Sequence, residues 1–133
     1  MKIIVCIDEK NGLTFGGKRQ SRDSVLIDDI ISLTSGKLLI SPFSSTLFSG
    51  KGARIASSPL SCADEDEYVF VEDEDCAKYF DVADEVILYR WNRLYPSDLR
   101  LSALPDECGL SLLERVDFVG TSHKKITRER YVK

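Results

Sequence analysis

Short apolar runs separated by polar, glycine-bearing segments make up most of this chain of 133 residues. Residues 2 to 7 form a continuous apolar run with β-branched members, which predicts a buried strand. From Ser24 to Ser35 the apolar residues instead recur near helical spacing, and Asp23 or Ser24 can cap the start of that helix. We expect the segment between them, Asp8 to Arg22, to be a polar loop.

The same patterns predict further elements along the rest of the chain. Strands are expected at Lys37 to Ser41, Ala53 to Ala56, Tyr68 to Val71 and Glu85 to Tyr89, and a short helix at Glu72 to Phe80. The segments Leu110 to Phe118 and Lys124 to Val132 suggest a closing antiparallel pair joined near Gly120. Strands that alternate with helices favour a mostly parallel central sheet with helices on its faces. We therefore expect a three-layer α/β fold with antiparallel C-terminal strands, built as one domain over residues 1 to 133.

Composition narrows the class of protein. Hydrophobic residues are 43% and charged residues 30%, an ordinary balance for a soluble domain, and no apolar run approaches the ~18 to 20 residues of a membrane span. The N-terminus lacks the features of a signal peptide, so we expect a cytoplasmic protein without a membrane partner. The net charge of −4 argues against nucleic-acid binding, which requires cations to neutralise phosphates.

Cysteine and histidine content argues against a metal site. The four cysteines lie far apart in the sequence without a CxxC pair, so we expect free thiols and no zinc. His123 is the only histidine, and the sequence shows no serine or cysteine nucleophile in an evident catalytic arrangement with it. It is therefore interpreted as a turn residue of the last hairpin.

The order of these elements resembles that of the dihydrofolate reductase family. The N-terminal block IIVCIDEKNGLTFGG, its following helix and the ending TSGK match the family's V-A-x-D-x-N-x-G-I-G-x-x-G-x-L-P-W and T-x-G-K. RIASSP resembles the strand and loop N-I-V-L-S-R-x-P, and FVGTSHKKITRERY resembles the last hairpin. Lys37 to Phe48 resembles the family's second strand and the segment after it, and Tyr68 to Trp91 resembles a strand, helix and strand that lead to its Gly-Gly turn. These five pieces in the family's order imply a dihydrofolate reductase-like fold in a shortened chain.

The resemblance also indicates that the family's reductase chemistry is absent. The family holds its pterin substrate with a carboxylic acid on the first helix and a tryptophan at the end of the first loop. In the ungapped register these positions hold Leu26 and Ser21, and leucine cannot transfer a proton. Asp29, about one turn away, is the candidate that could replace the acid, with a solvated carboxylate as the alternative interpretation.

The cofactor positions differ from the family as well. Phe43 occupies the place of the arginine that meets the 2′-phosphate of NADPH. In the most direct register, Arg90 and Trp91 stand where the family has a Gly-Gly turn beside the pyrophosphate, and bulky side chains there would block the cofactor. In a second register the turn and its helix are deleted. No cofactor is therefore predicted.

One cluster has the composition of a binding surface. Arginine, tyrosine and tryptophan are the residue types most enriched at binding hot spots. The expected surface consists of Phe43, Tyr89, Arg90, Trp91, Asn92, Arg93 and Tyr95. The alternative interpretation is a structural tryptophan that plugs the vacated groove, with solvated arginines around it.

Two functional hypotheses follow, with a third held beside them. The first is a diverged protein that has lost reductase activity and NADPH binding and binds an unknown small ligand or protein, with Trp91 and Phe43 filling the groove. The second is an NAD(P)H-dependent reductase of a pterin-like or other small substrate, which uses Asp29 or a water as its proton source. The third is a homo-oligomer joined through the terminal β-ribbon.

Some short bacterial proteins that look like this one carry the label ribonuclease Z. Enzymes of that name use a histidine-rich zinc motif, H-x-H-x-D-H, and one histidine in the whole chain cannot supply it. The chemistry therefore argues against that activity.

Overall fold

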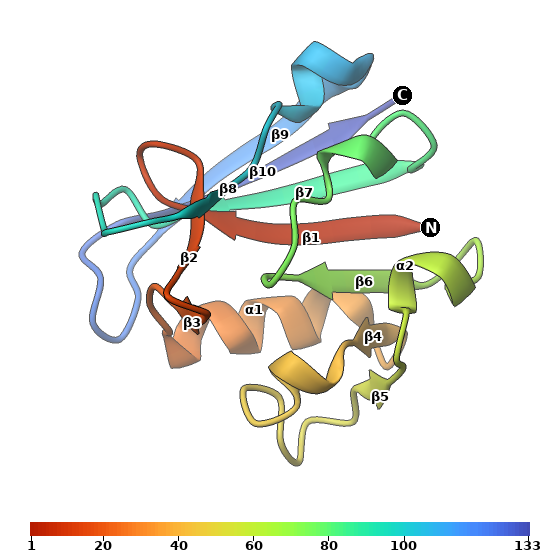
Figure 1. Ribbon diagram of the computed structural model, residues 1–133, viewed down its shortest axis with the longest axis horizontal. Coiled ribbons are helices and arrows are strands. Elements are labelled where there is room, and N and C mark those ends of the chain that lie inside the picture. Colours follow the sequence, from red (N-terminus) through yellow and green to blue (C-terminus); the bar gives the residue numbers. More distant parts are fainter.

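A computed structural model describes the whole chain, Met1 to Lys133, as a central seven-stranded sheet with a smaller three-stranded sheet beside one end (Figure 1). The strand orders are β5-β4-β6-β1-β7-β10-β9 and β3-β2-β8. The strands are β1 (Lys2–Ile7), β2 (Gly12–Phe15), β3 (Lys18–Arg19), β4 (Leu38–Ile40), β5 (Arg54–Ile55), β6 (Tyr68–Val71), β7 (Glu85–Arg90), β8 (Leu99–Arg100), β9 (Ser111–Phe118) and β10 (Ile126–Val132). The helices are α1 (Ser24–Thr34) and α2 (Pro59–Cys62), with 3₁₀ turns η1 (Pro42–Ser44), η2 (Ala77–Tyr79) and η3 (Pro105–Cys108).

The central sheet is mostly parallel, as the sequence predicts. Strand β1 lies in the middle and pairs in parallel with β6 on one side and β7 on the other. Strand β10 pairs antiparallel with β7 and β9, so the C-terminal ribbon forms one edge. The mixed α/β architecture with antiparallel C-terminal strands is therefore confirmed.

Successive side chains along each strand point to opposite faces of the sheet, so the hydrophobic core is divided into two clusters, one on each face. Ile4 belongs to the cluster that α1 covers, whereas Ile3 and Val5 belong to the cluster on the opposite face. Figure 1 shows α1 running along its face of the sheet. The opposite face is covered by short elements and loops, which contribute Leu13, Leu60, Phe80, Leu101 and Leu110 to that core. None of the helices combines the length and the apolar character that crossing a membrane requires.

Helix α1 begins where the sequence predicts. Asp23 is its N-cap, and one carboxylate oxygen of Asp23 accepts hydrogen bonds from the backbone N–H groups of Val25 and Leu26 at 3.0 and 3.4 Å. Leu26, Ile27 and Ile30 bury their side chains against the sheet. The cap fixes the position of the preceding residues, which form the wall of the site described below.

Two expectations about local structure are wrong. The segment Asp8 to Arg22 is not only a loop, because it contains β2 and β3. The segment Glu72 to Phe80 does not form one helix but only the turn η2, and Glu72 points into the protein with an exposed fraction of 6%. Its partner, the half-buried Arg19, lies in β3, far away in the sequence, so local periodicity cannot reveal the pair.

Candidate functional site

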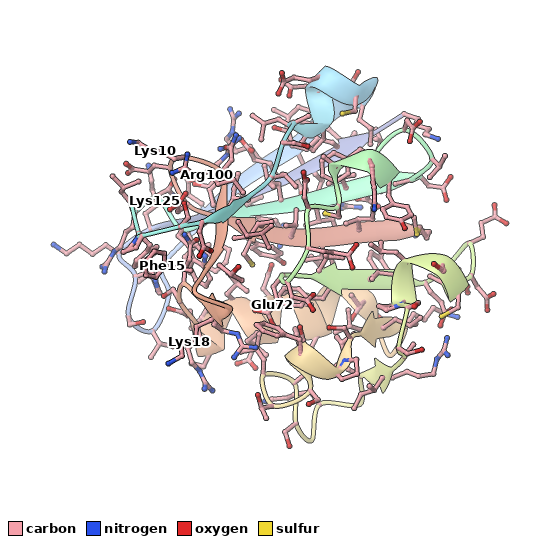
Figure 2. All side chains as sticks on the ribbon, viewed as in Figure 1. Lys10, Phe15, Lys18, Glu72, Arg100 and Lys125 are labelled. Carbon is pink, nitrogen blue, oxygen red and sulfur yellow. The ribbon has the colours of Figure 1, made fainter.

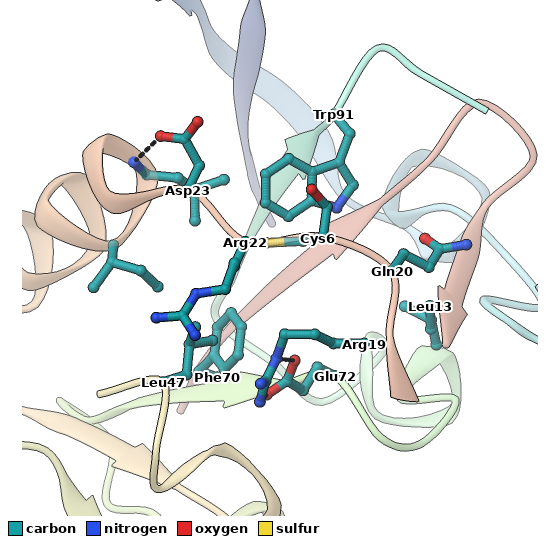
Figure 3. Close-up of a pocket in the computed structure, with 13 residues that line it drawn as sticks. Cys6, Leu13, Arg19, Gln20, Arg22, Asp23, Leu47, Phe70, Glu72 and Trp91 are labelled. Carbon is teal, nitrogen blue, oxygen red and sulfur yellow. Dashed lines mark hydrogen bonds and ion pairs between the residues drawn. The ribbon is translucent and has the colours of Figure 1, made fainter. Parts of the chain in front are cut away.

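A narrow pocket lies at the carboxyl ends of β1, β6 and β7, beside the first turn of α1 (Figure 3). Open α/β sheets generally bind ligands at this edge of their parallel strands. Cys6, Leu26, Phe70 and Trp91 line the pocket together with the segment from Arg19 to Asp23. Its cavity volume is about 20 Å³, which is room for little more than one water molecule.

An ion pair forms one wall of the pocket. Arg19 donates from Nε and Nη2 to the two carboxylate oxygens of Glu72 at 2.8 and 2.7 Å. The hydroxyl of Ser44 donates to the same carboxylate at 2.6 Å. Figure 3 shows Arg19 and Glu72 side by side, with a dashed line marking their contact. The carboxylate of Glu72 is therefore fully engaged within the protein.

A hydrogen-bonded chain of three side chains lies beside the pocket, and two of them, Ser21 and Asp23, line it. His123 reaches in from the loop between β9 and β10, and its Nδ1 lies 2.8 Å from Oδ2 of Asp23. On the other side of the ring, Nε2 lies 2.9 Å from Oγ of Ser21. His123 and Asp23 are 4% and 3% exposed, whereas Ser21 is half-buried. The fold thus places a serine, a histidine and an aspartate in line.

Two aromatic residues hold the ring of His123. The indole of Trp91 stacks on the imidazole with ring centroids 4.7 Å apart. The hydroxyl of Tyr95 lies 3.1 Å from Nε2 of His123 and 3.4 Å from Oγ of Ser21. The position of Tyr95 depends on Asp8, whose buried carboxylate accepts hydrogen bonds from the backbone N–H groups of Tyr95 and Gly12.

The charges of these groups follow from their surroundings. Burial alone would raise the pKa of Asp23, but hydrogen bonds from Ser122, Thr121 and His123 outweigh burial and lower this pKa below its usual value. Asp23 is therefore a carboxylate that can only accept, so Nδ1 of His123 carries a proton and donates it to Asp23. In the neutral ring, Nε2 is then the acceptor that faces Ser21.

The thiol of Cys6 is the other nucleophilic group at the pocket. Burial, and then the charge of Glu72, raise the pKa of this thiol well above its ordinary value. Cys6 is thus protonated and unreactive at neutral pH. All four cysteines are free thiols in the structure.

Asp29, the replacement candidate for the missing acid, does not line the pocket. Its carboxylate accepts two hydrogen bonds from Nη1 of Arg128, at 2.9 and 2.8 Å, and one from the hydroxyl of Tyr89 at 2.6 Å. Leu26, which takes the place of the acid in the expected register, does line the pocket.

The seven residues of the expected binding surface do not share one exposed face. Tyr89 is fully buried against α1, whereas Arg90 points to the opposite face and pairs with Glu129 at 2.7 Å. Strand alternation separates these neighbours. Trp91 is buried in the pocket wall, and Phe43 lies outside the pocket, beneath the guanidinium of Arg19.

The other three members of that expected surface lie near the molecular surface. Asn92 adopts a left-handed backbone conformation and donates to the backbone oxygen of Lys125 and to Oγ1 of Thr127. Arg93 is exposed and Tyr95 is half-buried. Of these three, Tyr95 also lines a shallow surface hollow of about 490 Å³. The hollow is lined by Lys10, Phe15, Leu94, Tyr95, Pro96, Ser97 and Arg100.

Sequence reasoning missed the contacts that the fold makes between residues far apart in the chain. Ser21 and His123 are 102 positions apart, and Arg19 and Glu72 are 53 apart. The signals available were weak: a solitary histidine beside a glycine turn, and a carboxylate directly after a buried strand. The structure contains no group of three or more histidine, cysteine, aspartate or glutamate side chains arranged to hold a metal ion.

No protein-family model and no curated protein sequence matches this chain. Solved structures do match, among them a dihydrofolate reductase from Enterococcus faecalis complexed with NADP(H) and RAB-propyl. The alignment covers 98% of this chain and 94% of that one, with a TM-score of 0.69 and 13% sequence identity. The chain therefore has a dihydrofolate reductase-like fold, and at this identity the similarity shows the fold alone.

Proposed function

We propose that this chain, whose fold is dihydrofolate reductase-like, is a binding protein that has lost reductase activity and NADPH binding. The observation that carries the proposal is the size of the pocket at the carboxyl ends of the parallel strands. Its volume is about 20 Å³, whereas small-molecule and cofactor sites usually enclose about 300 to 1,000 Å³. Neither a pterin nor a nicotinamide ring fits without displacing Trp91 or the Arg19–Glu72 pair.

The chemistry of the pocket lining supports the same proposal. Leu26 has no proton to transfer. The two carboxylates in the lining, Glu72 and Asp23, are both engaged by donors from the protein itself. A substrate would have to break a buried ion pair or a helix cap before either carboxylate could serve it.

The reductase hypothesis has less support. It requires Asp29 or a water to deliver a proton next to the substrate. Asp29 is held by Arg128 and Tyr89 and does not line the pocket. The position of Asp29 therefore favours a binding protein over a reductase.

The shallow hollow beside Tyr95 is the surface that best suits a ligand or partner. Its volume of about 490 Å³ lies within the usual range of binding sites. Phe15 and Leu94 expose 54% and 55% of their surface there, so the hollow offers two large apolar side chains to a ligand. Cations border these two residues, and Figure 2 shows Lys10, Phe15, Arg100 and Lys125 at the same end of the molecule.

The cations at this end lack ion-pair partners. Lys10, Lys18, Arg93, Arg100 and Lys125 take part in none of the salt bridges of the structure. The nearby acids are the buried Asp8 and the exposed Glu9 and Asp98. The carboxylates of Asp8 and Asp98 accept hydrogen bonds from backbone N–H groups. The whole chain carries a net charge of −4, so the positive charge around the hollow is a local excess. Together with the exposed apolar side chains, this excess favours an anionic partner with an apolar part, such as an acidic peptide.

A turnover assay tests the loss of reductase activity. The purified protein is incubated with NADPH and dihydrofolate, and the oxidation of NADPH is followed beside an active dihydrofolate reductase. We expect no oxidation above the rate without protein. Turnover that depends on this chain, and that Asp29→Asn abolishes, would establish the reductase hypothesis instead.

A binding assay tests the hollow. A fluorescent, Glu-rich peptide with one phenylalanine is titrated with the wild type and with the double variant Lys10→Glu/Arg100→Glu. We expect the variant to bind about 10-fold more weakly, because two attractive charges become repulsive. The matched control, Lys78→Glu/Lys133→Glu, makes the same change in net charge at cations outside the hollow and should retain wild-type affinity. Equal weakening by both variants would mean that only the net charge matters.

A further inference from the structure

The line of side chains from Ser21 through His123 to Asp23 has the geometry of a nucleophile, a base and an orienting carboxylate. The two contacts, Oγ to Nε2 at 2.9 Å and Nδ1 to Oδ2 at 2.8 Å, are both within hydrogen-bond distance. Such a line is recognised by geometry and roles rather than by sequence order. We propose that it is a hydrolytic site in which Ser21 attacks small carboxylic esters, an activity separate from the binding proposed for the hollow.

The order of exposure suits these roles. Asp23 and His123 are buried, so the orienting bond is shielded from water, whereas Ser21 is half-buried and lines the cavity. Trp91 stacks on the imidazole and restricts its rotation. The carboxylate of Asp23 is itself fixed by the backbone N–H groups of Thr121 and Ser122, at 2.9 and 3.0 Å. Each group of the line is therefore preorganised.

Donors for a developing oxyanion lie next to Ser21. The backbone N–H of Arg22, the residue that follows the nucleophile, makes no hydrogen bond within the protein. The side chain of Arg22 also lines the pocket and takes part in no salt bridge (Figure 3). These groups can receive negative charge that forms on a carbonyl oxygen.

The proposed reaction is a two-step transfer. Oγ of Ser21 bonds to the carbonyl carbon as its proton passes to Nε2 of His123. The bond from that carbon to the alcohol oxygen then breaks, and Nε2 returns the proton to the departing alcohol. Water attacks the acyl-serine in the same way, its proton passing through Nε2 to Oγ, so that a carboxylic acid is released and Ser21 is restored.

The cavity limits the acyl group. A volume of about 20 Å³ beside Ser21 accepts a methyl group but no longer chain. The site therefore takes acetyl esters in preference to esters of longer acids.

Hydrolysis of p-nitrophenyl acetate tests the proposal, with p-nitrophenyl octanoate as the long-chain comparison. We expect Ser21→Ala and His123→Gln to lower the rate on the order of 100-fold. Ser24→Ala, at the start of α1, is the matched control and should keep the wild-type rate. Asp23 is a positioning residue that does not touch the ester, so Asp23→Asn should lower kcat with little change in KM.

Covalent labelling provides a readout that does not depend on folded variants. A fluorophosphonate probe should label Ser21 of the native protein, located by peptide mass spectrometry, and should not label urea-unfolded protein. Wild-type rates in Ser21→Ala, faster cleavage of the octanoate than of the acetate, or labelling at lysines with Ser21 unmodified would each overturn the proposal.

Discussion

The carboxylate of Asp23 joins two segments that lie 100 positions apart in the sequence, because it caps α1 and also accepts a hydrogen bond from Nδ1 of His123 at 2.8 Å. The loop between β9 and β10 is thereby fixed to the start of the helix. Backbone N–H groups of Thr121 and Ser122 donate to the same carboxylate. One side chain therefore holds the wall of the candidate site in place.

Replacing Asp23 should destabilise the protein strongly. Asp23→Ala removes the helix cap and leaves the buried ring of His123 and two backbone N–H groups without an acceptor. We expect the free energy of unfolding to fall by about 3 kcal/mol, measured by urea denaturation. Asp28→Ala, on the exposed side of the same helix, should change it by about 0.5 kcal/mol or less.

Acid should weaken the protein through the same carboxylate. The pKa of Asp23 is lowered in the folded state, so its contribution to stability is complete above its unfolded value of about 3.9 and is lost as pH falls below it. We expect the free energy of unfolding to fall more steeply below about pH 4 in the wild type than in Asp23→Asn. Parallel pH profiles for the two proteins would contradict this role of Asp23.

Gly120 should not tolerate a side chain. A Cβ atom there would overlap the carboxylate of Asp23 and the side chain of Ile126. Gly120→Ala should therefore push the loop away from α1 and lower the melting temperature by several degrees, equivalent to about 2 kcal/mol. Val119→Ala, at a neighbouring position that is 71% exposed, is the control and should melt like the wild type.

The sequence predicts the central sheet and α1 well because their apolar periodicity is strong and local. It misses β2, β3 and β8, because these short strands are stabilised by one another and by packing on the larger sheet. Acidic residues after β6 are typical of a first helical turn, so the sequence wrongly assigns Glu72 to a helix. Its position instead depends on the ion pair with Arg19, which lies in a distant strand.

The candidate site is less predictable than the fold. The sequence identifies Leu26 and Trp91 through the resemblance to a known fold, and both do line the pocket. It gives no reason to place His123 beside Ser21, since that contact exists only once the last hairpin has packed against α1. Contacts of this kind are set by tertiary structure, which periodicity does not encode.

The Arg19–Glu72 pair, which forms one wall of the pocket, should contribute measurably to the free energy of unfolding. We expect a double-mutant cycle on the free energy of unfolding, with Arg19→Met and Glu72→Gln, to give a coupling energy of about 2 kcal/mol, because Glu72 is buried and accepts two hydrogen bonds from Arg19. The exposed Lys37–Asp66 pair provides the comparison and should give about 0.5 kcal/mol or less.

The most direct test of the central claim, that the pocket is closed to a nicotinamide cofactor, is thermal melting of the wild-type protein with NADPH up to millimolar concentration. A ligand at ~100 times its dissociation constant stabilises a folded protein by about 2.7 kcal/mol, which is a shift of several degrees for a domain of this size. We predict an unchanged melting temperature, while an NADPH-binding dihydrofolate reductase in parallel shifts upward. A rise of several degrees in this protein would show that the pocket opens to the cofactor and would contradict the account.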